Sequence, residues 1–407
     1  IVKKEEDIMK KFNKFLSVAV ASAMVMSMAG CGNTDNGSAA TGTNAATESA
    51  ASGSVFKIGG IGPTTGGAAV YGLAVQHGAE IAVEEINAAG GINGYQIEFK
   101  FQDDEADAEK SVNAYNALKD WGAQIIDGST TSGACIAVTD KTKEDNMFQI
   151  TPSGSAVECV QYDNNFRVCF SNPNQGLASA QYIGENGLAE KIAVIYDSSD
   201  VYSSGIYEKF VKEAENQPFE VVAAEAFTAD NKTDFSVQLQ KAKDAGADMV
   251  FLPIYYQESA LILTQAAAMG YAPKWFSCDG MDGILGGVDN FDVSLTEGVM
   301  LLTPFAADAT DDLTQSFVTK YKEKYGETPN QFAADSYDAI YVIKAAIEKS
   351  GVTPDMSVSD ICDGMKAAMT EITVDGLTGN GMTWTADGEA NKAPKAVVIE
   401  NGAYKAM

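Results

Sequence analysis

Residues 55–107 read VFKIGGIGPTTGGAAVYGLAVQHGAEIAVEEINAAGGINGYQIEFKFQDDEAD, and this stretch decides the fold. A short apolar run over 55–61 is followed by a glycine-rich loop, by apolar residues at helical spacing over 71–88, and by an alternating run over 96–101. The pattern predicts a strand, a helix and a second strand. Strands that alternate with helices of ten or more residues form parallel sheets with helices on both faces, so we expect an α/β fold.

The same alternation continues along the chain in two blocks, which are separated near Asn172-Pro173. Beyond those already named, the expected helices cover 107–121, 133–145, 175–186, 205–215, 235–245 and 257–269, and the expected strands cover 124–127, 148–151, 191–196, 220–227, 249–254 and 274–277. Each block therefore has the elements of one lobe with its own parallel sheet.

The C-terminal part follows a different pattern. We expect a strand over 298–303, three helices over 313–325, 332–349 and 357–369, a glycine-rich crossing segment over 376–388 with a hairpin-like strand near Met382, and a final strand over 396–400. Two complete blocks followed by leftover helices and strands indicate that this part is shared between the lobes. The chain is therefore expected to cross between them more than once.

Residues 9–31, MKKFNKFLSVAVASAMVMSMAGC, have the features of an export signal. Three lysines precede an apolar stretch over 15–28, which is shorter than the roughly 20 residues that a membrane-spanning helix needs. The small pair Ala29-Gly30 followed by Cys31 resembles the lipobox of bacterial lipoproteins, with Met28 where Leu is commoner. The resemblance implies a signal peptide over 9–30 and lipidation of Cys31. The alternative is an ordinary cleaved signal beside an incidental cysteine.

The segments on either side of this signal are not expected to fold. Residues 1–8 contain three acidic residues where a signal peptide has none, and their codons can include a ribosome-binding sequence, so we interpret them as an untranslated leader before Met9. Residues 31–54 contain almost only small and polar side chains and are predicted to form a flexible tether. Its root-mean-square reach is roughly 25–30 Å.

Composition limits the classes of partner. The part from 55 to 407 exceeds the ~250–300 residues at which single cores divide, which predicts two domains. A formal net charge of -28 argues against nucleic acid and against anionic lipid surfaces. With His77 as the only histidine and no CxxC pair, neither a metal site nor a Ser-His-Asp triad is indicated, and no cofactor is expected. Pairing of Cys159 with Cys169 stays open.

Loops at the carboxyl ends of parallel strands are the expected place for a ligand, because helix N-termini meet there. The loop over 59–67 departs from the dinucleotide pattern at Thr65 and loses a donor at Pro63, so a nucleotide site is not favoured. The loops over 128–133 and 151–155 are rich in hydroxyls. Each by itself reads as a helix cap, but together they have the chemistry to hold a carboxylate. The pair Asp103-Asp104 reads as a solvated cluster at a helix start.

Several runs together resemble the leucine-isoleucine-valine family of extracellular substrate-binding proteins of ABC transporters. They are GPTTG with the aromatic Tyr71, EEINAAGGINGYQIE followed by DD, the SG pair at 132–133, ITPSGS over 150–155, DVYSSG over 200–205, and TGNGMTWTADGEA over 378–390. The resemblance implies the type I periplasmic binding protein fold, with two Rossmann-like lobes joined by three crossovers and a ligand cleft between them. It implies one lobe from 55–170 plus 304–378, and the other from 171–303 plus 379–407.

The resemblance also implies the residues of a ligand site. The expected positions are Ser132, Ser153, Gly154 and Ser155 for an amino acid's α-carboxylate, Asp279 for its α-ammonium, and Tyr71, Tyr202 and either Tyr255 or Tyr256 as walls, of which we select Tyr255. The best-known members have Glu where this chain has Asp279, so ammonium contact is the less secure expectation. Asp279 can alternatively serve as a turn residue before Gly280, and the tyrosines as lobe-surface aromatics.

The function expected from this resemblance is that of a monomeric lipoprotein, not an enzyme, anchored at the extracytoplasmic face of the cell membrane. It would capture a branched-chain or related amino acid by closure of its lobes and deliver it to the permease and ATPase subunits of an ABC importer. The alternative is a receptor of the same fold that reports its ligand to a membrane signalling partner. The side chain of the ligand is left open.

Overall fold

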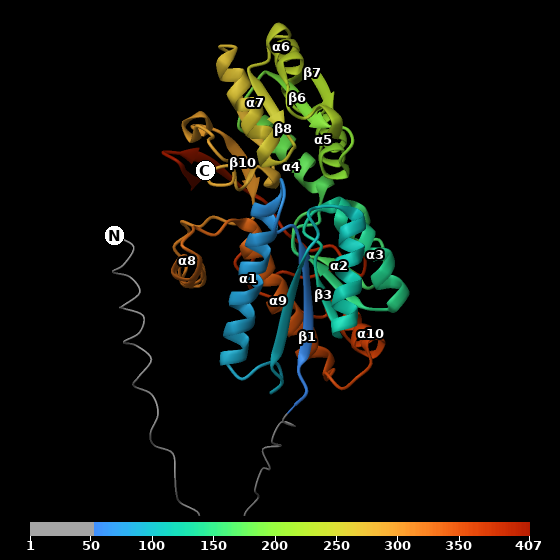
Figure 1. Cartoon of the computed structure of the whole chain (residues 1–407). Coiled ribbons are helices and arrows are strands. Elements are labelled where there is room, and N and C mark those ends of the chain that lie inside the picture. Colours follow the sequence, from blue (N-terminus) through green and yellow to red (C-terminus); the bar gives the residue numbers. More distant parts are fainter. Residues whose placement is uncertain (1–52) are drawn as a thin grey trace, which may run out of the picture. The chain divides into compact units, whose positions relative to one another are not determined.

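The computed structural model describes residues 53–407 (Figure 1). The leader over 1–8, the signal peptide over 9–30, lipidation at Cys31 and all but the last two residues of the tether over 31–54 lie outside the described residues. Between residues 53 and 407, none of the helices is long and apolar enough to cross a membrane.

The first sheet has five parallel strands in the order β2-β1-β3-β4-β5. The strands are β1 Phe56–Gly62, β2 Ile97–Asp103, β3 Ile125–Asp127, β4 Phe148–Thr151 and β5 Asn165–Arg167. Every residue of β3 and β4 is buried, as expected where helices cover both faces of a sheet. Gly60 stands inside β1 because a Cβ there would lie 2.3 Å from the ring of Phe101.

Six helices surround this sheet, and three of them come from the C-terminal part of the chain. They are α1 Ala69–Ala88, α2 Ala108–Trp121, α3 Ser132–Asp145, α8 Asp312–Tyr325, α9 Gln331–Ser350 and α10 Val358–Met369. The blue α1 and the orange α9 run side by side in Figure 1. They approach so closely that a Cβ on Gly78 would lie 2.0 Å from the carbonyl oxygen of Ala333.

The second sheet has seven strands in the order β12-β11-β10-β9-β8-β6-β7. They are β6 Lys191–Asp197, β7 Glu220–Phe227, β8 Met249–Leu252, β9 Lys274–Ser277, β10 Met300–Thr303, β11 Lys395–Glu400 and β12 Ala403–Ala406. All are parallel except β11 and β12, which pair antiparallel at one edge. The helices of this lobe are α4 Asn172–Glu185, α5 Val201–Ala214, α6 Ser236–Asp244 and α7 Tyr256–Ala268.

The predicted α/β class with two Rossmann-like lobes is confirmed, but some element boundaries differ. Helix α4 begins at Asn172 rather than 175, because Pro173 lies in its first turn, where a missing N–H costs nothing. Helix α5 begins at Val201 rather than 205, because the Asp200 side chain caps it by accepting a hydrogen bond from the Tyr202 N–H. The strand predicted over 396–400 is not the last, since β12 follows it in a hairpin.

The chain passes between the lobes after β5, after β10 and again before β11. We expected the last passage at residue 378. The Trp384 indole donates to the carbonyl of Arg167 in β5 (2.8 Å), and Lys392 Nζ lies 2.5 Å from Asp335 Oδ1 in α9. Because these contacts are with the first lobe, we propose that the final change of lobe follows Lys392.

Candidate functional site

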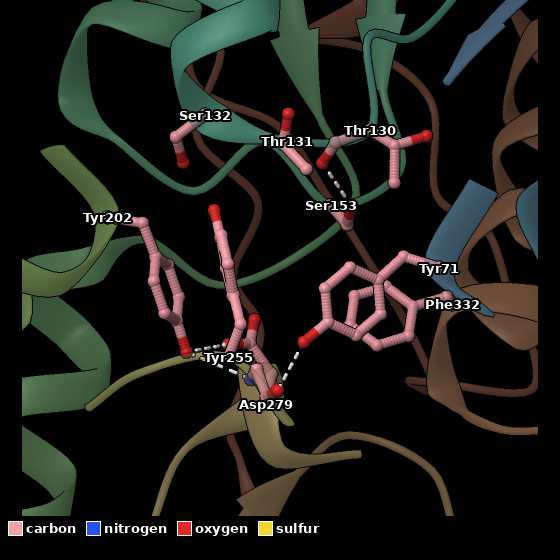
Figure 2. Close-up of a pocket in the computed structure, with 10 residues that line it drawn as sticks. Tyr71, Thr130, Thr131, Ser132, Ser153, Tyr202, Tyr255, Asp279 and Phe332 are labelled. Carbon is pink, nitrogen blue, oxygen red and sulfur yellow. Dashed lines mark hydrogen bonds between the residues drawn. The ribbon is translucent and has the colours of Figure 1, made fainter. Parts of the chain in front are cut away.

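A small cavity lies where strand ends of the two sheets face each other (Figure 2). Its lining consists of Tyr71, Thr130, Thr131, Ser132, Ser153, Tyr202, Tyr255, Asp279, Gly280 and Phe332. All of the expected site residues belong to this lining except Gly154 and Ser155. The loops after β3 and β4 supply its hydroxyl groups, whereas the segments after β8 and β9 supply Tyr255 and Asp279.

Ser132 is the first residue of α3, and its hydroxyl is arranged as a donor toward the cavity. Its Oγ accepts hydrogen bonds from the backbone N–H groups of Ser155 (3.2 Å) and Ala156 (3.1 Å). A hydroxyl has two acceptor positions and one proton, so the proton of Ser132 is left for another acceptor. An anion in the cavity would provide that acceptor.

Thr131 adds a second free hydroxyl at the same place. It is the N-cap residue of α3, yet no side chain caps this helix, and its buried Oγ1 has no hydrogen-bond partner among residues 53–407. A helix N-terminus with uncapped N–H groups carries a positive partial charge, which favours a carboxylate nearby. The hydroxyl side of the cavity therefore offers donors without a formal charge.

The loop over 153–155 contributes only Ser153 of its three expected residues to the cavity lining. The Ser153 hydroxyl donates to the carbonyl of Thr130 (2.5 Å), so it faces the cavity as an acceptor. A Cβ on Gly154 would lie 2.8 Å from Thr151 Oγ1, which explains the glycine in this tight turn. Ser155 is buried behind the lining, and its Oγ has no partner in the described part of the chain.

Asp279 lies on the opposite side, in the short helix η3 Asp279–Met281 that follows β9 (Figure 2). Its Oδ1 accepts from the Tyr202 hydroxyl (2.6 Å) and its Oδ2 from the Gln175 amide (2.9 Å). The Gln331 amide donates to its backbone carbonyl (3.1 Å). Tyr202 and Gln175 thus fix the direction of this carboxylate, and Gln331 holds the backbone that carries it.

Burial raises the pKa of Asp279 to about 7, although the hydrogen bonds from Tyr202 and Gln175 act in the opposite direction. A carboxyl with this pKa is close to half protonated at neutral pH. A cation in the cavity would favour the charged form and lower the pKa again. The acid side of the cavity is therefore able to compensate a positive charge.

Aromatic rings form the remaining walls, and Tyr71, Tyr202 and Phe332 are buried whereas Tyr255 is half-buried. The rings of Tyr71 and Phe332 are 4.4 Å apart, and those of Tyr202 and Tyr255 stack at 5.0 Å. The Tyr71 hydroxyl donates to the carbonyl of Gly280, so a side chain on α1 bonds directly to the second lobe. Figure 2 shows Tyr255 extending from the second lobe toward Ser132 and Thr131.

Sequence reasoning missed part of this lining. Thr130 and Thr131 lie in the hydroxyl run that drew attention to the loop, but they were not singled out within it. Phe332 and Gln331 begin α9, more than fifty residues after Asp279, and no local pattern links them to the cavity. Only the packing of α9 against α1 brings them there.

The structure also describes other residues that the sequence singles out. The prediction that Asp103 and Asp104 are both solvated is wrong for Asp104. This residue is fully buried and accepts a hydrogen bond from Ser129 (3.0 Å). Asp103 is exposed and caps the loop at the Thr64 N–H (2.8 Å). Cys159 and Cys169 are buried free thiols. Across residues 53–407 there is no group of three or more metal-ligating side chains.

Comparison with known proteins agrees with this architecture. The model of the periplasmic binding protein family matches residues 55–403. A Leu/Ile/Val-binding protein homologue of Brucella melitensis is 30% identical over 300 residues, which cover 73% of this chain and 80% of that protein. A leucine-, isoleucine-, valine-, threonine- and alanine-binding protein of Pseudomonas aeruginosa is 30% identical over 303 residues, or 73% and 79% of the two chains.

Solved structures give the same result. The branched-chain amino acid transporter substrate-binding protein LivJ of Streptococcus pneumoniae, in complex with isoleucine, has a TM-score of 0.78 at 29% identity and covers 86% of this chain and 98% of its own. The leucine-binding protein LivK of Thermotoga maritima has a TM-score of 0.77 at 27% identity and covers 87% and 98%. The chain belongs to the periplasmic binding protein family, in the group of the Leu/Ile/Val-binding protein homologues.

Proposed function

We propose that this protein is the extracytoplasmic substrate-binding component of an ABC importer and that it captures an amino acid by closing its two lobes. The observation that carries the proposal is the opposition of two groups across one cavity. Free hydroxyl donors at the N-terminus of α3 line one side, and the buried carboxylate of Asp279 lines the other. The names of its relatives support the same function.

The ligand that fits this opposition is a zwitterion. Removing an ammonium and a carboxylate from water is costly unless both charges find partners. Ser132 and Thr131 would donate to the carboxylate beside the positive end of α3, and Asp279 would accept from the ammonium. The ligand's side chain would then lie against Tyr71, Tyr255 and Phe332, where aromatic rings favour an apolar group.

Hydrogen bonds that join the two lobes at the cavity support closure of the lobes around a ligand. Tyr71 on α1 bonds to Gly280 and also accepts from the Tyr256 N–H (3.2 Å), and both partners belong to the second lobe. A ligand held between Ser132 and Asp279 would add a further connection of the same kind. We propose that binding therefore favours the closed arrangement, since a ligand stabilises the state in which it makes more contacts.

The ligand class, the anchor and the partners rest on similarity. We propose a branched-chain or related amino acid, because relatives from several bacteria carry that specificity in their names. We also propose that lipidation of Cys31 holds the protein at the outer face of the membrane, where permease and ATPase subunits would receive the ligand.

A thermal-shift screen of the protein against common amino acids tests the proposal. A ligand at 100 times its dissociation constant adds about 2.7 kcal/mol of stability, which a melting curve detects readily. We expect leucine, isoleucine or valine to stabilise the protein, and their deaminated analogues to stabilise it less. A screen in which no amino acid raises the melting temperature would contradict the proposed function.

A further inference from the structure

The sequence contains a single arginine, Arg167, and it is fully buried. It is the last residue of β5, next to the point where the chain first passes to the second lobe. A buried guanidinium is costly unless its donors and its charge are matched. The groups that accept its hydrogen bonds and balance its charge therefore indicate what Arg167 does.

The donors of Arg167 hold the loop that follows β4. Its Nη1 donates to the carbonyl of Gly154 (3.2 Å), and its Nη2 donates to the carbonyls of Ala156 (2.8 Å) and Val157 (3.4 Å). A planar fork with five fixed donors suits such a set of carbonyls, whereas a lysine ammonium acts as a single point. The loop is thus fixed from behind by one side chain.

The same loop is held from the front by Ser132. The peptide group between Gly154 and Ser155 is planar and trans, so its C=O and N–H point in opposite directions. Its oxygen faces Arg167, and its N–H bonds to Ser132 Oγ at 3.2 Å. Arg167 therefore orients the Ser155 N–H, which is one of the two donors that occupy the acceptor positions of Ser132 and leave its proton to the cavity.

Arg167 is also tied to the last passage of the chain between the lobes. Its Nε lies 3.3 Å from Glu389 Oε2, and its backbone N–H donates to the carbonyl of Gly388 (3.0 Å). Glu389 is about one-third exposed, at 34%. The carboxyl of this glutamate thus balances the buried charge from a segment that leads directly into the second sheet.

We propose that Arg167 is a positioning residue for the carboxylate side of the cavity, and that Glu389 holds the arginine in place. The inference rests on the proposed function, because it concerns affinity for the same ligand. Arg167 does not line the cavity and acts through the 154–157 loop and Ser132. The segment around Glu389, through which the chain passes back to the second lobe, is thereby connected to the Ser132 hydroxyl that would bind the ligand's carboxylate.

A double-mutant cycle on the full chain tests the inference, with affinities for leucine, isoleucine and valine measured by titration calorimetry. The four proteins are wild type, Arg167→Lys, Ser132→Ala and the double variant. We expect Arg167→Lys to weaken binding at least tenfold in the wild-type background, but less than threefold when Ser132 is already alanine. Residues that act through one unit give such non-additive effects, whereas independent ones add.

Matched variants keep the test decisive. If Arg167→Lys does not fold, Glu389→Gln replaces it in the same cycle, since this residue is partly exposed and its substitution retains the arginine but removes the carboxylate that holds it. We expect a threefold or larger loss of affinity that disappears with Ser132→Ala. Glu371→Gln, which breaks an exposed ion pair with Lys349 (2.9 Å) in the same lobe, is the control and should leave affinity unchanged.

The outcomes separate the two proposals. Unchanged affinity in the Arg167 or Glu389 variant, or an equal loss with and without the Ser132 hydroxyl, would overturn the positioning role while wild-type binding stands. Failure of the wild-type protein to bind any of the three amino acids would instead overturn the proposed function, and the inference with it.

Discussion

The two sides of the cavity differ in how they are built. The hydroxyl side comes from two loops of one lobe, and its groups are neutral: Ser132 and Thr131 beside a helix N-terminus. The acid side depends on Asp279, whose carboxylate is bonded by Gln175 and Tyr202 and whose backbone is bonded by Gln331, from three helices. One side is local in sequence and independent of pH, whereas the other is assembled from distant segments and titrates.

This difference suggests a division of labour. Neutral donors at a helix end stabilise a carboxylate at any pH at which the ligand carries one, and they leave no uncompensated charge when the cavity is empty. A buried carboxylate is costly when the cavity is empty, which is why the pKa of Asp279 is raised to about 7. The acid side should therefore decide between amino acids and other carboxylic acids.

The largest expected effect is that of Asp279→Asn. An amino acid's ammonium would be buried without its counter-charge, a loss that costs about 2–5 kcal/mol, or roughly thirty- to several-thousandfold in affinity. Calorimetry with leucine and with 4-methylpentanoic acid, which lacks the ammonium, measures the contrast. The second ligand should lose little. Equal losses for the two would mean that Asp279 only shapes the turn before Gly280.

Ser132→Ala should have the next largest effect, because it removes a donor to a charged group. Such a hydrogen bond contributes about 1.5–3 kcal/mol, or roughly ten- to a hundredfold in affinity. Ser153→Ala is the matched comparison, since the Ser153 proton is already donated to Thr130 and is not available to the ligand. Both the amino acid and its deaminated analogue should weaken with Ser132→Ala. A larger loss with Ser153→Ala would reverse the assignment of donors.

Ligand binding should depend on pH through the acid side alone. If the ammonium requires ionised Asp279 with a pKa of about 7, affinity for leucine should fall about tenfold from pH 8 to pH 6, as the carboxyl takes up its proton. Titrations of wild type and Asp279→Asn over this range provide the measurement. The variant should show a flat profile. A slope that persists in the variant would point to another titrating group.

The sequence predicted those parts of the site that local patterns encode. The two hydroxyl loops lie at strand ends, which the alternation of strands and helices is sufficient to locate, whereas Asp279 was expected from the family resemblance. Gln331, Phe332 and Arg167 were missed for a physical reason. Their roles depend on which face of α9 packs on α1 and on which carbonyls a buried side chain meets, and neither has a local signature.

The direction of side chains within a turn also could not be predicted from the sequence. Ser153, Gly154 and Ser155 were expected to act as one group, yet the loop is pulled back at its carbonyls by Arg167 and only Ser153 of the three lines the cavity. The arginine itself was visible as the only one in the chain. A lone arginine in a chain with a net charge of -28 is a signal worth using elsewhere.

The last expected effect concerns stability rather than binding, and it separates Asp279 from a buried carboxylate outside the cavity. Asp127 is fully buried, its Oδ1 has no partner within residues 53–407, and burial raises its pKa to about 7. Since its unfolded pKa is about 3.9, the folded protein holds a proton between pH 4 and 7 that the unfolded chain has lost. The free energy of unfolding therefore falls as pH rises through this window, by at most about 1.4 kcal/mol per pH unit for this group.

Asp127→Asn should reduce the drop in melting temperature between pH 5 and pH 8 and leave leucine affinity unchanged. An unaltered pH dependence of melting would show that Asp127 ionises in the folded protein as it does in the unfolded chain.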